Sequence, residues 1–444
     1  MNIGFVSLGC PKNRVDTEIM MAILKNTGHK IVNSLVDADA VIINTCGFIN
    51  SAQEEAIDTI IETGKLKENG KLKYLIATGC LTQRFGLQLL DELPELDGIA
   101  GIASLTRIHE LIAGVQNGER IMAIEPVPEV FLEKGPRLLS TPPGSAYLKI
   151  SEGCNNRCSY CTIPSIRGNL RSRPLEELVL EARDLAKRGV KEIVLVAQDT
   201  GVYGWDLYGR HTLTDLLKEI NKIEGLVWIR LMYLHPLHIS DELIDTLTGE
   251  SKIIPYLDIP IQHAANKILK LMNRQHDTLH LRKLVADLRH HINDLVLRTT
   301  VMVGFPDETE DDFKQLYDFV GETEFDCLGV FAYAAEEGTP AAVMEAQVAE
   351  EVKLQRLHEI SALQQKISRR KNIARLDTQV KILVSSQSGK NLYLGRGYYQ
   401  APEVDGLTVV KSKSRLTKGE FYDVQLVGVR NYDMIGELVD EPAE

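Results

Sequence analysis

The chain has 444 residues, of which 44% are hydrophobic and 25% are charged, the balance of a soluble globular protein. Its length predicts two to four domains rather than one core. Residues 1–18 lack the basic and apolar regions of a signal peptide, and no apolar run reaches the roughly 18 residues of a membrane span. We therefore expect a cytoplasmic protein without membrane contact, in which clustered cysteines bind metal or do chemistry rather than form disulfides.

The net charge of −12 at pH 7 disfavours non-specific binding to a polyanion such as nucleic acid, although it does not exclude a local basic groove. The same charge suits approach to a basic protein partner. It serves solubility alone equally well.

Residues 1–130 alternate short apolar runs with helical patterns. Runs of strand length occupy residues 2–8, 40–45 and 73–79, and the segments between them carry apolar residues at helical spacing. This alternation predicts an N-terminal parallel α/β domain. Residues 134–147 are rich in Pro, Gly and Ser, which is typical of a linker.

Residues 140–370 repeat the alternation six times with longer spacing. The runs of strand length are 146–150, 192–198, 227–233, 256–261, 296–305 and 328–333. Six successive βα units predict a full or partial parallel (β/α) barrel, with its active site at the C-terminal ends of the strands. A long charged helix is expected next, over 345–376.

The pattern changes again over residues 373–441, where short strands are separated by turns. The runs of strand length are 378–386, 393–399, 406–412, 419–429 and 436–441. This pattern predicts a small antiparallel β-barrel at the C-terminus.

Six of the seven cysteines fall into two groups of three. The first triad has the spacing C-x3-C-x2-C, and the second has one cysteine at the end of each N-terminal apolar run. The first triad is Cys154, Cys158 and Cys161, and the second is Cys10, Cys46 and Cys80. Because the ends of parallel strands meet at one edge of a sheet, we expect the second triad to converge there. Cys327 has no such neighbours and is expected in a core.

Thiolates in threes suit a 4Fe–4S cubane that leaves one iron open to a reactant. Two alternatives stay open. In the first alternative, the first triad binds a zinc ion together with a fourth protein ligand from elsewhere in the chain. In the second alternative, the cysteines of the second triad are small buried apolar side chains that bind no metal.

The stretch "GCNNRCSYCTIP", residues 153–164, resembles the cluster loop of radical S-adenosylmethionine (SAM) enzymes, with the aromatic Tyr160 before the third cysteine. The resemblance implies that the first triad binds a 4Fe–4S cluster whose open iron binds SAM. Electron transfer to SAM then gives a 5′-deoxyadenosyl radical in such enzymes. Fe–S clusters reach potentials as low as about −700 mV, which this cleavage requires.

The resemblance extends over nearly the whole chain. "SLGCPKNRVDTE", "INTCGFINSAQEEAID" and "ATGCLTQR" resemble the N-terminal domain of radical SAM methylthiotransferases, and the C-terminal module resembles a TRAM domain. The implied domains are a methylthiotransferase domain at 1–130, a radical SAM core at 140–370 and a TRAM domain at 373–441. The implied cofactors are SAM and two 4Fe–4S clusters, the second on Cys10, Cys46 and Cys80. One SAM gives a methyl group to sulfur, and another gives the radical that activates a C–H bond.

The family divides into members that modify adenosine derivatives of tRNA and a branch that modifies an aspartate of small-subunit ribosomal protein twelve. "CPKN", "VAQDTGVYGWDLYG" and "DIPIQH" resemble the ribosomal branch. Residues 377–444 hold eight Lys/Arg against ten Asp/Glu, a net of −2, whereas an RNA-gripping module is expected to be basic. The alternative is that this module only packs on the core.

The expected reaction is therefore methylthio insertion at the β-carbon of an aspartate in ribosomal protein twelve. The expected partners are that protein, by itself or on the ribosome, and a reductant such as a flavodoxin or a ferredoxin. Two alternatives remain: a tRNA-adenosine methylthiotransferase, and a non-catalytic, zinc-bearing ribosome-assembly adaptor.

Further candidate residues lie at predicted strand ends or after the cluster loop. The resemblance implies SAM contacts for several of them. The structural alternative for residues 304–309 is a strand-to-helix turn in which Thr309 caps the next helix. The alternative for His263 is a structural role, and the alternative for the arginines is a solvated surface. The candidates for cofactor binding are Gln198, Gln262, His263, Gly304, Phe305, Pro306 and Arg167. Arg171 and Arg173 follow the cluster loop together with Arg167, and these arginines are expected to pair with the carboxylate of SAM or of the substrate aspartate.

Overall fold

The computed structural model describes residues 1–132 and 134–439, which form two compact units. Unit 1 comprises residues 1–140, 149–173 and 334–342, and unit 2 comprises 141–148, 174–333 and the chain from 343 onward. The segment 149–173 carries the first cysteine triad, so both triads belong to unit 1. Residues 440 and 441, the last two of the predicted TRAM domain, lie outside the described residues.

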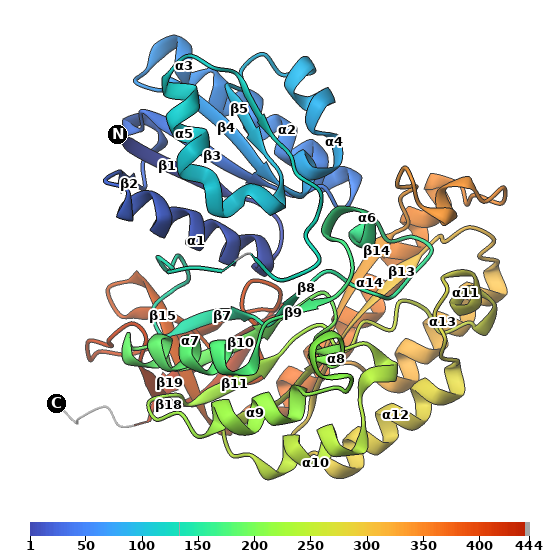
Figure 1. The fold of residues 1–444 in the computed structure, drawn as a ribbon. Helices are drawn as coiled ribbons and strands as arrows, with labels where there is room; N and C mark the ends of the chain where they lie inside the picture. Colours follow the sequence, from blue (N-terminus) through green and yellow to red (C-terminus); the bar gives the residue numbers. More distant parts are fainter. Residues whose placement is uncertain (133, 440–444) are drawn as a thin grey trace. The chain divides into compact units, whose positions relative to one another are not determined.

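Unit 1 contains a six-stranded sheet in the order β2-β1-β3-β4-β5-β6, and every neighbouring pair is parallel. Figure 1 shows α1 and α5 on one face of this sheet and α2 and α4 on the other. All six residues of β3 are buried, which is why this strand reads as a continuous apolar run. The strands are β1 (Asn2–Ser7), β2 (Lys30–Val32), β3 (Ala40–Thr45), β4 (Tyr74–Gly79), β5 (Gly98–Ala100) and β6 (Ile121–Ala123).

The helices of unit 1 follow these strands and confirm the predicted parallel α/β domain. They are α1 (Pro11–Asn26), α2 (Asn50–Gly64), α3 (Leu66–Asn69), α4 (Cys80–Glu92) and α5 (Ile108–Gln116), with the 3-10 turns η1 (Leu35–Asp37) and η2 (Ile102–Arg107). The segment with the first triad adds the hairpin β8 (Ser151–Glu152) and β9 (Arg171–Ser172), with α6 (Ile163–Arg167) between them.

Unit 2 contains the second six-stranded sheet, in the order β14-β13-β12-β11-β10-β7, and the pairs from β10 to β14 are parallel. This is the predicted partial (β/α) barrel. All six predicted strands are present, since each is apolar enough to be recognised alone, but the fourth covers residues 253–258 rather than the predicted 256–261. They are β7 (Ser145–Lys149), β10 (Glu192–Val196), β11 (Trp228–Leu231), β12 (Ile253–Asp258), β13 (Val296–Val303) and β14 (Cys327–Ala332).

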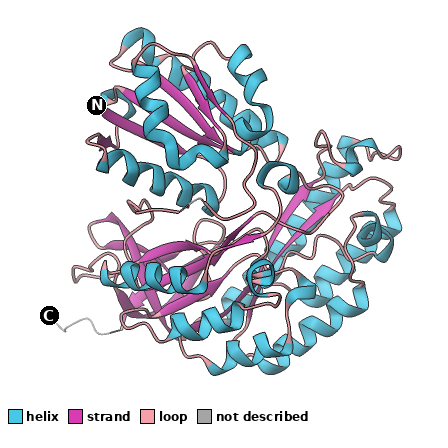
Figure 2. Ribbon diagram, viewed as in Figure 1, coloured by secondary structure: helices cyan, strands magenta, loops and turns pink. Residues whose placement is uncertain are grey.

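The helices of unit 2 lie between these strands in the chain, except the last, which follows β14, and Figure 2 shows helices as a layer along the sheet. They are α7 (Leu175–Lys187), α8 (Trp205–Tyr208), α9 (Leu213–Asn221), α10 (Asp241–Gly249), α11 (Asn266–Leu271), α12 (Thr278–His291), α13 (Glu310–Thr323) and α14 (Glu350–Ala374), with the 3-10 turns η3 (Thr200–Val202), η4 (Pro236–His238) and η5 (Pro340–Val343). Among residues 1–132 and 134–439, no helix is both long and apolar enough to cross a bilayer.

The C-terminal part of unit 2 is a closed five-stranded barrel in the order β15-β16-β17-β19-β18. Four of its pairings are antiparallel as predicted, but β17 and β19 pair in parallel. The parallel pair closes the barrel, because β18 and β19 form a hairpin that brings β19 back beside β17. The strands are β15 (Gln379–Gly389), β16 (Leu392–Arg396), β17 (Thr408–Lys411), β18 (Phe421–Arg430) and β19 (Asp433–Leu438).

Candidate functional site

The second triad lies at the C-terminal edge of the unit 1 sheet. Cys10 is the N-cap of α1, Cys46 follows β3, and Cys80 is the first residue of α4 directly after β4. The register pairs Thr45 with Gly79, so Cys46 and Cys80 follow directly on paired residues of neighbouring strands. The sequence prediction that parallel strands would bring these three positions to one edge is thus met by the backbone.

The glycines beside these cysteines pack so closely on neighbouring turns that an added Cβ would clash. Gly9 has φ +83°, and a Cβ on it would lie 2.8 Å from Cys46 Cβ and 3.1 Å from Cys46 Sγ. A Cβ on Gly47 would lie 2.6 Å from the Cα of Leu81, the residue after Cys80. The three cysteine-bearing turns therefore approach one another closely because glycine stands beside each cysteine.

Burial disfavours ionisation of two of these thiols, Cys46 and Cys80. Burial raises the pKa of Cys46 to about 12, and the nearby Cys80 and Cys10 add to the shift. Burial also raises the pKa of the Cys80 thiol, while the guanidinium of Arg167 acts in the opposite direction. The mutual influence of the three thiols shows that they share one neighbourhood. Their protons leave when a metal binds, because the thiolate is the ligand.

The first triad lies on the loop between β8 and α6. The amide of Cys161 donates to the carbonyl of Cys158 at 3.1 Å, which folds the C-x2-C part into a turn, and the amide of Cys154 donates to Gly168 O at 3.1 Å. Gly153 has φ +75°, and a Cβ on it would lie 2.0 Å from Asn169 O. Only glycine fits where the two ends of the loop meet before Cys154.

Contacts within unit 1 link the two triad-bearing loops. Thr162 Oγ1, next to Cys161, donates to Phe48 O at 3.4 Å, two residues beyond Cys46. The amide of Ala341 donates to Ser159 O at 2.9 Å. From the same segment as Ala341, the buried Glu336 accepts from Arg84 Nη1 at 2.9 Å, and that guanidinium also donates to Gly47 O at 3.1 Å.

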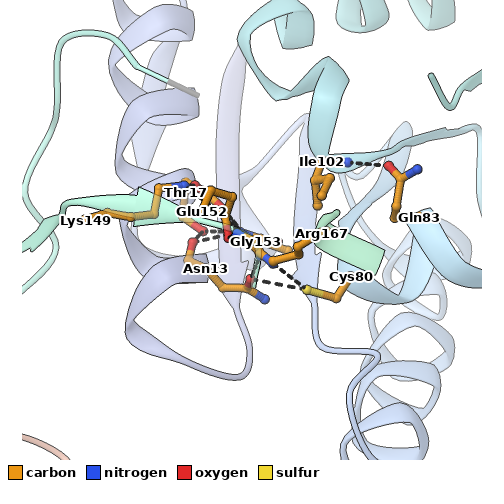
Figure 3. A network of polar contacts seen from close by, with 12 residues as sticks. Asn13, Thr17, Cys80, Gln83, Ile102, Lys149, Glu152, Gly153 and Arg167 are labelled. Carbon is orange, nitrogen blue, oxygen red and sulfur yellow. Dashed lines mark hydrogen bonds and ion pairs between the residues drawn. The ribbon is translucent and has the colours of Figure 1, made fainter. Parts of the chain in front are cut away.

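Arg167, at the end of α6, makes the most direct link (Figure 3). Its Nε lies 3.2 Å from Cys80 Sγ, and its Nη2 donates to Asn13 Oδ1 at 2.5 Å. Its Nη1 donates to Glu152 Oε2 at 2.5 Å and lies 3.4 Å from Asp16 Oδ2. Lys149 completes the group by pairing with both Asp16 and Glu152.

The burial of the arginines after the cluster loop contradicts one of their two interpretations, a solvated surface, and leaves a contact with SAM as a prediction. They were expected either to pair with the carboxylate of SAM or of the substrate, or to lie on a solvated surface. Arg167, Arg171 and Arg173 are all buried, and Arg167 pairs with carboxylates of its own chain. Arg171 donates to the carbonyl of Arg167 at 2.8 Å, so these arginines build the interior of unit 1.

Within the described residues, no group of three or more His, Cys, Asp or Glu side chains is arranged to hold a metal ion. All seven cysteines are thiols, and Cys80 is turned toward Arg167. The donor set nevertheless suits the predicted clusters, since soft thiolates are the ligands of iron–sulfur centres and each triad offers three of them. The six cysteines therefore stay predicted ligands.

Several SAM candidates of unit 2 come together around the ends of β12 and β13. Gln262 adopts φ +69° and bridges to Val301 of β13. His263 is fully buried; its Nδ1 accepts from the amide of Ala265 at 3.0 Å, and its Nε2 lies 3.5 Å from Glu308 Oε2. His263 Nε2 is buried and has no hydrogen-bond partner, so a contact with SAM stays a prediction for this residue.

The segment after β13 also serves the fold. Gly304 has φ +70° and packs against Lys353, and the fully buried Phe305 packs against Tyr333 with ring centroids 5.3 Å apart. Thr309 caps α13 in a capping box with Asp312, as the structural alternative predicted. Pro306 lies in the same turn.

Gln198 comes from a different strand end. It follows β10, which is separated from β12 by β11, and it precedes Asp199, the N-cap of η3. Cys327, expected in a core, begins β14 and lines a cavity of about 580 Å³ together with Arg298 and Asp405.

Sequence reasoning missed the charged residues of the unit 1 network. Asp16, Lys149 and Glu152 are all at most 3% exposed. The signal for Lys149 and Glu152 was a charge inside or next to an apolar strand, "AYLKISEG", where an unpaired charge is costly. Asp16 gave no such signal, because acidic residues in helices are common at surfaces.

Comparison with known proteins decides the family. Residues 148–320 match the radical SAM superfamily, residues 2–101 match uncharacterized protein family UPF0004, and residues 378–439 match the TRAM domain. The chain is 61% identical over 437 residues to ribosomal protein uS12 methylthiotransferase RimO of Syntrophomonas wolfei, covering 98% of this chain and all of that one. The RimO of Clostridioides difficile is 47% identical, with both chains fully covered.

This chain belongs to the RimO family. It is a radical SAM methylthiotransferase, and the cofactors that this family implies are SAM and two 4Fe–4S clusters. Solved structures support the fold. TsrM of Kitasatospora setae, a radical SAM methyltransferase, superposes with a TM-score of 0.55 at 15% identity, covering 77% of this chain and 75% of that one. OxsB, a cobalamin-dependent SAM radical enzyme, gives 0.51 at 13% identity, covering 81% of this chain and 56% of that one.

Proposed function

We propose that this chain inserts a methylthio group at the β-carbon of an aspartate in ribosomal protein uS12, with one SAM as methyl donor and another as radical source. The observation that carries the proposal is the 61% identity to a RimO over 98% of this chain. The two family models that match residues 2–101 and 148–320 cover all six triad cysteines. The net charge of −12 also suits a basic ribosomal protein. The tRNA alternative is not favoured by these relatives.

The side chains have separate tasks in this reaction. We assign Cys154, Cys158 and Cys161 to the cluster that binds SAM, and Cys10, Cys46 and Cys80 to the cluster on the sulfur side. A cubane held by three thiolates supplies an electron and an open iron for a reactant. The protein contributes the placement of the thiols on neighbouring loops of unit 1 and a buried environment around Cys80 and Cys154, which limits access of water.

We also propose that the electron comes from a flavodoxin or a ferredoxin and that the protein works in the cytoplasm. A strongly reducing cluster needs a one-electron donor of low potential, which these carriers are. Seven thiols without a disulfide are typical of a reducing compartment. Gln198, Gln262 and the backbone of Gly304 and Phe305 remain our proposed neighbours of SAM.

The test is a direct comparison of substrates. Anaerobically reconstituted protein is incubated with SAM, dithionite and sulfide, and with either a uS12 peptide containing the target aspartate or unmodified tRNA. We expect the mass increase of one methylthio group on the peptide and none on the tRNA. A peptide with asparagine in place of the aspartate is the matched control. Product on tRNA alone would overturn the proposed substrate.

The zinc-bearing adaptor is tested by metal analysis. The proposed enzyme should contain iron and acid-labile sulfide in amounts that correspond to two cubanes, and it should cleave SAM when reduced. One zinc per chain without iron after anaerobic purification would favour the adaptor instead.

A further inference from the structure

We infer that Arg167 is a positioning residue for the second triad: its guanidinium donates to the Cys80 sulfur and raises the reduction potential of the cluster bound there. This inference rests on the proposed second cluster. It concerns a buried side chain that acts on a ligand through a hydrogen bond, and it assigns no contact with SAM or substrate to this residue.

The geometry of the guanidinium supports this role. Arg167 is 1% exposed, so the 3.2 Å contact between its Nε and Cys80 Sγ is shielded from water. The other end of the guanidinium is held by Asn13 Oδ1 and Glu152 Oε2, each at 2.5 Å. Because a planar guanidinium held at both Nη atoms cannot rotate freely, the Nε–H is fixed toward the sulfur.

The residues that hold Arg167 come from segments that carry ligands of both triads. Asn13 and Asp16 lie on α1, which begins after Cys10, and Glu152 lies two residues before Cys154. Arg167 itself ends the helix that follows Cys161. A displacement of either loop therefore changes the position of the guanidinium, which links the geometry of the two triads.

The charged side chains around Arg167 are neutral as a group without any charge on the Cys80 sulfur. Lys149 and Arg167 offset Asp16 and Glu152, so the four side chains sum to zero. The thiolate of Cys80 in a metal complex adds negative charge beside the Nε–H, and reduction of the cluster adds one electron more. A donor fixed toward that sulfur stabilises the reduced form, and hydrogen bonds to sulfur are among the factors that set Fe–S potentials.

Unit 1 offers a matched control in the pair of Arg137 and Glu18. Both are buried, Glu18 lies on the same helix as Asp16, and Arg137 Nη2 is 2.6 Å from Glu18 Oε2. A role of Arg167 limited to burying an ion pair predicts that substitution of either arginine has the same consequences. A role through the sulfur predicts consequences for Arg167 alone.

The experiment separates the clusters by removing one triad at a time. One full-length chain carries C154A, C158A and C161A and keeps the second triad; the other carries C10A, C46A and C80A and keeps the first. Into each we introduce R167K, which keeps the charge. If that single change prevents folding, we use R167Q together with E152Q, which keeps the charge balance. R137K is the control in both chains.

Each chain is reconstituted anaerobically with iron and sulfide, and three properties are measured. These are the midpoint potential, the EPR spectrum of the reduced cluster and the rate of iron loss to a chelator. For the second triad we expect both Arg167 variants to lower the potential, change the EPR spectrum and speed iron loss roughly 10- to 100-fold, the usual effect of removing a partner of a metal ligand. For the first triad we expect an unchanged potential, and R137K should change neither cluster.

Three outcomes would overturn the inference: equal shifts in both clusters, no shift in either, or the same shift from R137K. Absence of any cluster on the chain that keeps the second triad would overturn both this inference and the proposed second cluster. Product on tRNA in the substrate assay would instead leave the role of Arg167 untouched, so the two failures are distinguishable.

Discussion

Each unit buries a carboxylate between cationic side chains, but the remaining donors of these cations have different acceptors in the two units. In unit 2, Glu192 of β10 binds Arg230 of β11 and Arg396 of β16, with Arg230 Nε 2.9 Å from Oε1 and Arg396 Nη2 2.5 Å from Oε2. In unit 1, Glu152 binds Lys149 and Arg167. All of these side chains are buried.

The difference lies in where the remaining donors go. Arg230 Nη1 donates to Tyr398 O at 2.8 Å and Arg396 Nη1 donates to Gln400 O at 3.2 Å, so these charged side chains of unit 2 join the parallel sheet to the C-terminal barrel. In unit 1 one donor of Arg167 ends on a thiol. The printed donors of Arg230 and Arg396 thus end on carbonyl or carboxylate oxygens, whereas one donor of Arg167 ends on a sulfur.

The largest effects should come from the cysteines, and they test whether the two triads differ in function. We expect C154A to abolish reductive SAM cleavage, since the cluster that binds SAM loses a ligand. We expect C46A to spare cleavage but to prevent transfer of sulfur to the uS12 peptide. The measurements are 5′-deoxyadenosine formation and the mass of the peptide. Equal loss of cleavage in both variants would contradict this division of labour, and C327A is the control that should affect neither.

The next effect tests the structural cluster of unit 2. E192Q leaves two buried guanidinium groups without their counter-charge, so we expect a loss of about 3 to 5 kcal/mol in the free energy of unfolding. The measurement is urea denaturation at neutral pH followed by circular dichroism. The control is E420Q, because Glu420 is 45% exposed in its pair with Lys191 and such pairs contribute under about 1 kcal/mol. A similar loss in both variants would show that burial does not set the cost.

Acid provides a second measurement of the same cluster. The cations of Arg396 and Arg230 overcome burial and lower the pKa of Glu192 from 4.5 to about 2. Since the folded pKa lies below the unfolded one, the stabilisation is complete above pH 4.5 and is lost as the pH falls toward 2. It corresponds to about 3 kcal/mol at neutral pH. The stability difference between wild type and E192Q should therefore shrink over this range, and a constant difference would contradict it.

Much of the fold was predictable because the relevant strands are long and apolar. β1, β3, β4 and the six strands of the partial barrel each form a run that stands out alone. β2, β5 and β6 have three residues each, too short for a pattern. The parallel pairing of β17 with β19 was not predictable, since turn signals report neighbours along the chain rather than barrel closure.

The site was predictable only as far as its cysteines. Spacing and strand ends single out six thiols, but Arg167 and Cys80 are 87 positions apart and no local pattern joins them. Asp16 looks like an ordinary helix residue until the fold buries it. Contacts of this kind depend on the packing of unit 1, which the order of residues does not reveal.

A smaller effect tests the packing around the second cysteine triad of unit 1 without changing any charge. G9A places a Cβ 2.8 Å from Cys46 Cβ at φ +83°, so we expect a loss of about 1 to 3 kcal/mol in stability and faster iron loss from the second triad. G28A is the matched control: φ is +91°, but nothing lies within 4 Å of its Cβ, so it carries the backbone cost alone. Chelator assays and thermal unfolding distinguish the two. Equal iron loss from both variants would show that contact with Cys46 is immaterial.

The smallest effect concerns the hydroxyl of Thr309, which caps α13 in unit 2. Its contribution to stability is the reference for the cost of E192Q in the same unit. Thr309 Oγ1 donates to Asp312 Oδ2 at 2.6 Å and accepts from the amide of Asp312 at 3.2 Å. Both functions of the hydroxyl are thus used within α13. T309A should cost about 1 kcal/mol, well below the cost of E192Q, and T309S should restore most of it. Because the hydroxyl is occupied by the cap, the KM for SAM should stay unchanged in T309A. A raised KM with unchanged stability would instead place Thr309 against SAM.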